Sequence, residues 1–175
     1  KLNALKSEIE IRLALIEELT VWFARAPPPF ALHRLSGGES SDCFRFDLDE
    51  PPAGIPQRLV LRLVREDGGA ARECAIQTAV AAQGFPVPRI FREGSSASAF
   101  HRPFSIMAFA AGRDPIADGA VRRLPQILAG TMHDLHAVPS DAIRASLGAH
   151  GEEISRMELA ATIEETAEFA LAPAD

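Results

Sequence analysis

Three consecutive prolines, residues 27–29, divide the chain into a helical start and a strand-rich continuation. Before them, apolar residues recur at helical spacing from Leu2 to Phe23, at positions 2, 5, 9, 13, 16, 19 and 23, with charged residues between them. Proline lacks the backbone N–H and its ring clashes with the preceding turn, so a helix cannot continue through these residues. An amphipathic helix with this apolar face is therefore predicted.

Beyond the prolines, short apolar runs separated by glycine and proline predict strands. A hairpin is expected where two such runs flank Gly37 and Gly38, and Gly84 is placed as the C-terminal cap of a helix. The expected elements are a hairpin in 30–46, a strand in 59–65, a helix in 69–83, strands in 89–92 and 104–109, and helices in 118–137 and 152–171. This order predicts an α+β fold with a five-stranded antiparallel sheet, one helix packed on it, and a helical region after it.

Composition and charge narrow the class of protein. Of the 175 residues, 47% are hydrophobic and 24% are charged, which is typical of a globular protein. The net charge of −6 argues against a nucleic-acid partner, and no apolar run approaches the roughly 20 residues that span a bilayer. We expect a cytoplasmic protein without a membrane partner, in which Cys43 and Cys74 are free thiols because they lack metal-like spacing.

One cation occupies an unusual place in the strand at 59–65. Alternation puts Val60, Arg62 and Val64 on one face of that strand, so Arg62 has apolar neighbours. A cation on a buried face needs an anionic partner, and Glu73 on the following helix can supply it. The alternative is that Arg62 lies at a solvent edge and Glu73 at the rim of the helix.

Several segments, taken together and in order, resemble the aminoglycoside phosphotransferase and choline kinase-like family over about residues 30–140. The matching segments are Leu-Ser-Gly-Gly-Glu-Ser-Ser (35–41), Leu-Val-Leu-Arg (59–62), Glu73, Gly-Phe-Pro-Val-Pro-Arg (84–89), Pro-Phe-Ser-Ile-Met-Ala-Phe-Ala-Ala-Gly (103–112) and Leu-His-Ala-Val (135–138). The resemblance implies a protein kinase-like fold, with an N-terminal helix (1–29), a nucleotide-binding lobe and hinge (30–112), and the beginning of a helical lobe (113–175).

The resemblance also implies a set of phosphate-binding residues. The turn with Gly37, Gly38 and Ser40 would cover the nucleotide phosphates, because glycine lets backbone N–H groups approach closely. Arg62 would replace the lysine that orients the phosphates, and Glu73 would hold it. Ser41 departs from the pattern, since members often have asparagine there.

A second set of residues would bind the base through the backbone. By the same resemblance, Met107 would lie at the back of the adenine pocket, the Ala108 carbonyl would accept from the purine amino group, and the Ala110 N–H would donate to the ring. Plain core is the competing interpretation for Ile106, Met107 and Phe109.

The catalytic residues of the family are not expected in this chain. The family uses a His-Gly-Asp motif, a following asparagine and a magnesium-binding aspartate, whereas the only asparagine here is Asn3. His150-Gly151-Glu152 carries Glu for Asp and is interpreted as a helix start, and His133 with His136 lacks a third ligand. We therefore expect no catalytic or metal residue here, magnesium ligands in a segment outside this chain, and an incomplete polypeptide.

Three functions remain open at this point. The first is the nucleotide-binding portion of a kinase that uses ATP or GTP with magnesium to phosphorylate a hydroxyl of an unknown small molecule. The second is a non-catalytic module that binds a nucleotide or a partner, and the third is an α+β domain with an architectural likeness only. In the first case the chain alone is expected to be inactive, and exposed apolar helix faces are expected to cause self-association.

Overall fold

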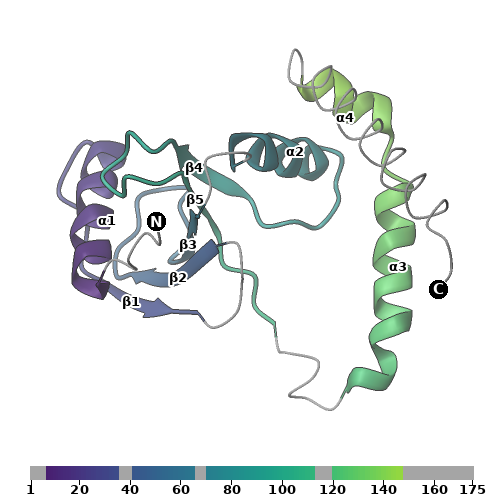
Figure 1. Cartoon of the computed structure of the whole chain (residues 1–175), viewed down its shortest axis with the longest axis horizontal. Coiled ribbons are helices and arrows are strands. Elements are labelled where there is room, and N and C mark those ends of the chain that lie inside the picture. The colour runs from purple at the N-terminus through teal and green to yellow at the C-terminus, as the bar shows by residue number, and fades with distance from the viewer. Residues whose placement is uncertain (1–6, 36–40, 66–69, 113–119, 148–175) are drawn as a thin grey trace, which may run out of the picture.

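The computed structural model describes residues 7–35, 41–65, 70–112 and 120–147 (Figure 1). In chain order the elements are α1 (Glu8–Phe23), β1 (Phe30–Arg34), β2 (Ser41–Leu48), β3 (Arg58–Val64), α2 (Ala70–Ala82), β4 (Ile90–Gly94), β5 (Phe104–Ala108), a 3-10 turn η1 (Ala120–Arg123), α3 (Leu124–His136) and α4 (Ser140–Leu147).

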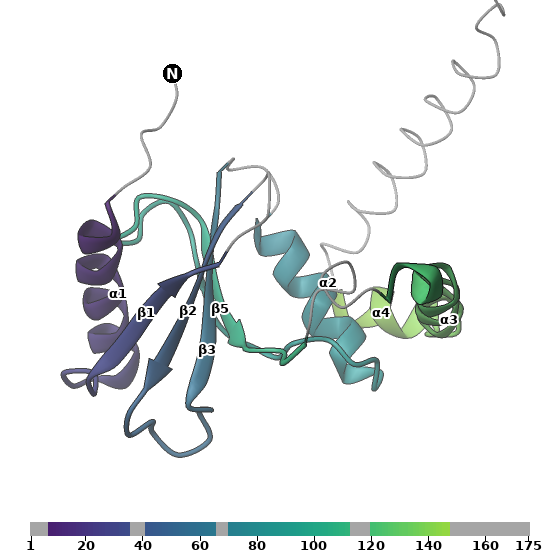
Figure 2. The same ribbon diagram turned by 90° about the horizontal axis from the view of Figure 1, so that it is seen from below.

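The five strands form one sheet in the order β1-β2-β3-β5-β4, and every neighbouring pair is antiparallel. β5 therefore lies between β3 and β4, although it follows β4 in the chain. Helix α1 covers one face of the sheet, and α2 lies on the other side, alongside β4 and β5 (Figure 2). The predicted fold, a five-stranded antiparallel sheet followed by helices, is confirmed.

The helix α1 forms where the sequence predicts it, but a different face packs on the sheet. It begins with a capping box in which Ser7 and Glu10 satisfy each other's backbone N–H groups, and it ends at Ala24, just before the prolines. Ile11 and Leu15 are buried in the core. The expected face is wrong in part, because its members Ile9 and Leu13 are 71% and 61% exposed, whereas Leu19 is fully buried.

A buried glutamate explains why the spacing of apolar residues in α1 did not identify the packed face. Glu18 lies in the packed stripe of α1 and is only 8% exposed. Its carboxylate accepts hydrogen bonds from Arg92 at 3.0 Å and from the backbone N–H of Ala99 at 3.1 Å. These partners compensate the desolvation of the charge, so a charged residue occupies a core position that sequence patterning reserves for apolar ones.

The core lies between α1 and the sheet. Leu59, Leu61 and Leu63 of β3 all point to this side and are fully buried, as the alternation predicts. Phe46 from β2 and Ile106 from β5 lie beside them in neighbouring strands. Each such side chain stabilises the fold by about 1.5–3 kcal/mol, so β3, at the centre of the sheet, is the best anchored element.

The helices after the sheet are partly as expected. Gly84 ends α2 with a φ of +85°, which confirms its role as a C-terminal cap. The segment expected to be helical at 118–137 is η1 followed by α3, and Pro139 separates α3 from α4, a short helix that was not predicted. The helix expected in 152–171 lies outside the described residues. No helix in the described ranges is long and apolar enough to cross a membrane.

Candidate functional site

The face of the sheet opposite α1 carries the predicted cation and the predicted base-contacting residue. Arg62 on β3 lies in register between Cys43 of β2 and Ser105 of β5. Two residues earlier on β3, Val60 pairs with Met107. Alternate residues along a strand are about 7 Å apart, so the row of Arg62 lies next to a row in which Val60 and Met107 follow Arg45 of β2.

Arg62 pairs with Glu73, as expected from the sequence. The Nη1 atom of Arg62 donates to Oε2 of Glu73, which connects the centre of the sheet to the first turn of α2. The Glu73 side chain is 51% exposed, so it lies at the rim of the helix, as the alternative interpretation held, whereas Arg62 lies on the central strand and its side chain is 24% exposed. The guanidinium is thus positioned and still accessible from solvent.

The guanidinium of Arg62 has a second partner that the sequence did not predict. Ser41, the first residue of β2, is 6% exposed, and its Oγ lies 3.3 Å from Nε of Arg62. Ser41 is the position at which the sequence departs from the asparagine common in the resembling family. The serine hydroxyl accepts the Arg62 hydrogen bond, so Arg62 is held from both β2 and α2.

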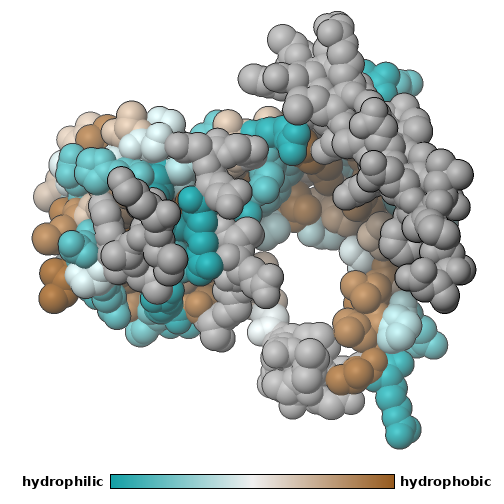
Figure 3. All heavy atoms as spheres, viewed as in Figure 1, coloured by the Kyte–Doolittle hydropathy of each residue, from teal (hydrophilic) through white to brown (hydrophobic). Residues whose placement is uncertain are grey.

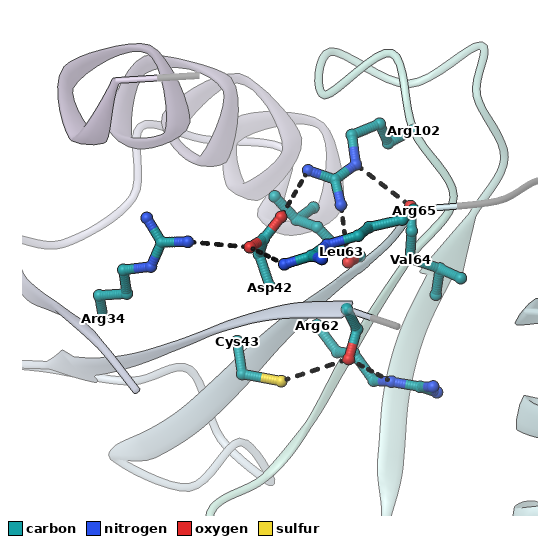
Figure 4. Close-up of polar contacts among 9 residues, drawn as sticks. Arg34, Asp42, Cys43, Arg62, Leu63, Val64, Arg65 and Arg102 are labelled. Carbon is teal, nitrogen blue, oxygen red and sulfur yellow. Dashed lines mark hydrogen bonds and ion pairs between the residues drawn. The ribbon is translucent and has the colours of Figure 1, made fainter. Parts of the chain in front are cut away.

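The neighbouring residue on β2, Asp42, points to the opposite face and gathers three arginines (Figure 4). Its carboxylate lies 2.9 Å from Arg34, 2.9 Å from Arg102 and 3.3 Å from Arg65. Arg102 also donates to the carbonyls of Leu63 and Val64, so it ties the loop before β5 to the end of β3. This cluster fixes the strand ends next to residues 36–40.

The environment of Asp42 has opposing effects on its pKa. Burial alone would raise the pKa of this carboxyl, but hydrogen bonds and charges from Arg102 and Arg65 outweigh burial, and the pKa is lowered from its ordinary value. Asp42 is therefore a carboxylate at neutral pH. Sequence analysis missed this cluster because its four members lie on four separate segments.

The two cysteines are free, and they differ in environment. Cys74 on α2 is buried, and burial together with the carboxylate of Glu93 raises the pKa of its thiol to about 11. Cys43 is partly exposed, and its Sγ lies 3.9 Å from the Oγ of Ser41. Cys43 is thus the more accessible thiol, and it adjoins Arg62 on the open face.

The residues expected to contact the base through their backbone lie at the end of β5 and just after it. The Ala108 N–H donates to the Arg89 carbonyl at 2.8 Å, and the Phe109 N–H donates to the Arg58 carbonyl at 3.2 Å. Ala110 is exposed, and no acceptor among the described residues receives its N–H. Met107 is half-buried on the open face.

A sequence model of the phosphotransferase enzyme family (APH) matches residues 31–173. The chain belongs to the phosphotransferase enzyme family. This confirms the family expected from the sequence segments. No curated protein sequence matches the chain.

Solved structures with similarity to this family member are aminoglycoside phosphotransferases. One, a putative enzyme from Ralstonia eutropha JMP134, is 26% identical over 55% of this chain, which covers 28% of that chain, at a TM-score of 0.41. Two thermostable mutants of APH(4)-Ia, in complexes with hygromycin B and either ADP or AMP-PNP, are each 20% identical over 78% of this chain. This chain covers 39% of each, at TM-scores of 0.43 and 0.44. It therefore spans less than half the length of these structures.

In this family member, Phe109 is not part of the hydrophobic core. Its ring lies under two guanidinium groups, with centroid distances of 5.9 Å to Cζ of Arg45 and 5.8 Å to Cζ of Arg58. Both arginines also pair with Asp47. The core interpretation of Phe109 is therefore wrong, whereas that of Ile106 is confirmed by its complete burial.

The glycine turn and the histidines are the remaining residues for which the sequence suggested a role in a site. Gly37, Gly38 and Ser40, and the segment around His150, lie outside the described residues. His133 and His136 are both exposed on α3, and no group of three potential metal ligands occurs in the described part of the chain.

A hollow of about 510 Å³ lies between α2 and β4, near Leu147 of α4. Cys74 and Glu93 are among its lining residues, whereas none of the predicted binding residues is. The hollow adjoins the candidate site, since Glu93 pairs with Ser105, the β5 neighbour of Arg62.

Proposed function

We propose that the chain is the nucleotide-binding portion of a cytoplasmic ATP- or GTP-dependent phosphotransferase that phosphorylates a hydroxyl of a small molecule. The observation that carries the proposal is the accessible Arg62 guanidinium, held by Glu73 on the open face of the sheet. Membership of the phosphotransferase family supports the reaction class.

The proposed role of Arg62 follows from the chemistry of phosphoryl transfer. The protein contributes mainly positioning and charge stabilisation, because little covalent chemistry falls to its side chains. A guanidinium fixed by Glu73 and Ser41 loses little conformational entropy when it donates to phosphate oxygens. We place the nucleotide phosphates at Arg62, under the turn with Gly37, Gly38 and Ser40.

The base would then lie one row further along the sheet. Val60 and Met107 form an apolar surface about 7 Å from the Arg62 row, which suits the face of a purine ring. At its edge, the Ala108 carbonyl would accept from the base and the Ala110 N–H would donate to it. The exposed position of Ala110 supports this assignment.

Magnesium would supply charge neutralisation between the phosphates when bound. The described residues offer no cluster of ligands for it, and the oxygen ligands that magnesium prefers are expected from a segment outside this chain, together with the catalytic aspartate. The contribution of this chain is therefore to bind and orient the nucleotide, and the chain alone is proposed to be inactive.

Calorimetric titration with ATP and GTP in the presence of magnesium tests the proposal. Arg62→Met keeps much of the apolar stem and removes the charge, and we expect it to weaken nucleotide binding by about 10- to 100-fold, the value of one or two charge-assisted hydrogen bonds. Arg12→Met is the matched control, since Arg12 donates to the Phe30 carbonyl at 3.0 Å on the α1 side of the sheet.

The results of these titrations distinguish a working nucleotide site from a non-catalytic binding module. Saturable binding that Arg62→Met weakens and Arg12→Met leaves unchanged supports a working nucleotide site. Absence of binding by the unmodified chain, or equal effects of both substitutions, would count against it. Binding by a longer protein that transfers no phosphate to any acceptor would instead favour a non-catalytic binding module.

We further propose that the isolated chain self-associates through α3. Hydrophobic surface gathers over this helix, facing an opening beside the sheet lobe (Figure 3). Ile127, Leu128 and Met132 are each about half exposed, at 50%, 54% and 48%. Sedimentation velocity over a range of concentrations tests this proposal, and a single monomeric species at the highest concentration would contradict it.

A further inference from the structure

Phe109 connects the end of β5 to the segment that leads out of the sheet. Its backbone N–H bonds to the Arg58 carbonyl, so it continues the β3–β5 ladder by one residue. Its side chain follows the alternation of Ser105 and Met107 and lies on the open face of the sheet. Phe109 is therefore flanked by Ala108 and Ala110, the two residues proposed to bind the base.

Two arginines from neighbouring strands hold the Phe109 ring. The guanidinium of Arg45 on β2 and that of Arg58 on β3 both lie within 6 Å of the ring centroid, at 5.9 and 5.8 Å, which is the range of cation–π attraction. Asp47, the residue opposite Arg58 in the β2–β3 register, lies 3.2 Å from Arg45 and 3.5 Å from Arg58. One carboxylate thus keeps both cations beside one ring.

The burial of these groups decides which arginine contributes more. The Arg45 side chain is 31% exposed and that of Arg58 is 59% exposed, so water screens the Arg58 contact more strongly. The Nε of Arg45 is buried and has no hydrogen-bond acceptor among the described residues. Its cation is therefore stabilised mainly by Asp47 and the ring of Phe109.

We propose that Arg45, Arg58 and Phe109 form a hinge clamp, which positions the backbone of residues 108–110 for the base of the nucleotide. This proposal rests on the proposed nucleotide-binding function and assigns it three positioning residues. A carbonyl and an N–H recognise a base only if their peptide planes keep one orientation. The plane of the Ala108 carbonyl is held by the bond from the Phe109 N–H to Arg58, whereas the Ala110 N–H has no acceptor among the described residues. The clamp holds this second plane through the side chain of Phe109.

Amide hydrogen exchange in the nucleotide-free chain tests the clamp directly. Phe109→Leu keeps an apolar side chain and removes the aromatic ring, and Arg45→Met removes the less exposed of the two cations. In both variants we expect the amides at positions 108 and 109 to exchange about five- to tenfold faster, because Phe109→Leu loses both cation–π contacts and Arg45→Met loses that of Arg45. Phe109→Tyr keeps the ring and should restore the slow exchange.

Arg12→Met is the matched control for the exchange experiment. The guanidinium of Arg12 lies 5.3 Å from the centroid of the Phe30 ring on the other side of the sheet, so the substitution removes a similar contact away from the hinge. It should leave the amides at 108 and 109 unchanged. Unchanged exchange in Phe109→Leu and Arg45→Met would overturn the clamp. A uniform increase across β2 and β3 would also overturn it, by showing that the ring only stabilises the fold.

Binding of two ligands gives a second test of the same residues. A clamp that orients the base should affect ADP, and it should not affect inorganic triphosphate, which has no base. We expect Phe109→Leu and Arg45→Met to weaken ADP binding by about five- to tenfold and to leave triphosphate binding unchanged. Equal weakening of both ligands would contradict the clamp.

The two proposals can fail separately. If the unmodified chain binds neither ADP nor triphosphate, the proposed nucleotide function fails, and amide exchange still decides whether the clamp exists. If the unmodified chain binds ADP and Arg62→Met weakens that binding while Phe109→Leu does not, the nucleotide site stands and the clamp is refuted.

Discussion

Replacement of Asp42 by asparagine should destabilise the protein strongly, because it leaves three arginines around a neutral side chain. The Asp42 side chain is 3% exposed and that of Arg102 is 13% exposed, so this pair is buried, and breaking a buried pair costs about 3–5 kcal/mol. Arg34 and Arg65 are 49% and 47% exposed, and their contacts contribute about 0–1 kcal/mol each. Because asparagine still accepts hydrogen bonds, we expect a loss of about 3 kcal/mol for Asp42→Asn.

Urea unfolding measures this loss without the charge screening that a guanidinium salt would add. Trp22 is the single tryptophan, and its ring centroid lies 6.4 Å from that of Phe91 on β4, so its fluorescence reports the loss of contact between α1 and the sheet. The midpoint should fall at an unchanged slope. Arg34→Met, which removes only a half-exposed partner, should cost less than about 1 kcal/mol.

The relative size of these losses tests the contribution of the buried ion pair. Asp42→Asn and Arg102→Met should both cost several times as much as Arg34→Met, because Arg102 also loses its bonds to two carbonyls. A loss below about 1 kcal/mol for Asp42→Asn would refute the claim that buried ion pairing holds these strand ends.

Three further predictions follow from burial and ionisation. The pKa of the Asp42 carboxyl is lowered in the folded state. Ionised Asp42 therefore stabilises the fold above its unfolded pKa of about 3.9, and this stabilisation is lost as the pH falls through the folded pKa. In acid titration, Asp42→Asn should lose less stability over this pH range than the unmodified protein. Leu15→Ala should lower the free energy of unfolding in urea by about 2–5 kcal/mol and Leu13→Ala by less than about 0.5 kcal/mol, since Leu15 is fully buried and Leu13 is 61% exposed. Equal losses would instead support the helix face predicted from the sequence. A maleimide should modify Cys43 well before Cys74, whose buried thiol has a pKa of about 11, and peptide mass spectrometry checks the order.

Local rules predicted the central sheet well. The alternation in β3 placed Leu59, Leu61 and Leu63 on one face, and all three are fully buried. The same alternation placed Arg62 on the other face, where it meets Glu73. These features depend on spacing within one strand or on adjacent elements, which is information that a sequence carries directly.

Helix faces were less predictable. The apolar spacing in α1 selected Ile9 and Leu13, but the packed stripe runs through Glu18, whose partners Arg92 and Ala99 lie more than 70 residues away. A charged residue enters the core only when such partners exist, and they become apparent only in the folded chain. The short helix α4 was missed, because the helices expected from the sequence end at 137 and resume only at 152.

The arginine clusters depend on register. The gathering of Arg34 and Arg102 at Asp42, and of Arg45 and Arg58 at Phe109, requires the pairing of strands whose relative shift the sequence does not state. A shift of one residue in a strand would turn the side chains of that strand to the other face. The sequence shows arginines in and beside the strands, but it does not identify their partners.

The strand order has a consequence for how the protein is made. β5 separates β3 from β4, so β4 cannot join the sheet until β5 has paired with β3. During synthesis, the ribosome must add residues 65–103 before β5 can begin to pair, and over that interval β3, the central strand of the complete sheet, has one unpaired edge. Nascent chains of this length should therefore be the form most in need of a chaperone, and the one most prone to pair with each other.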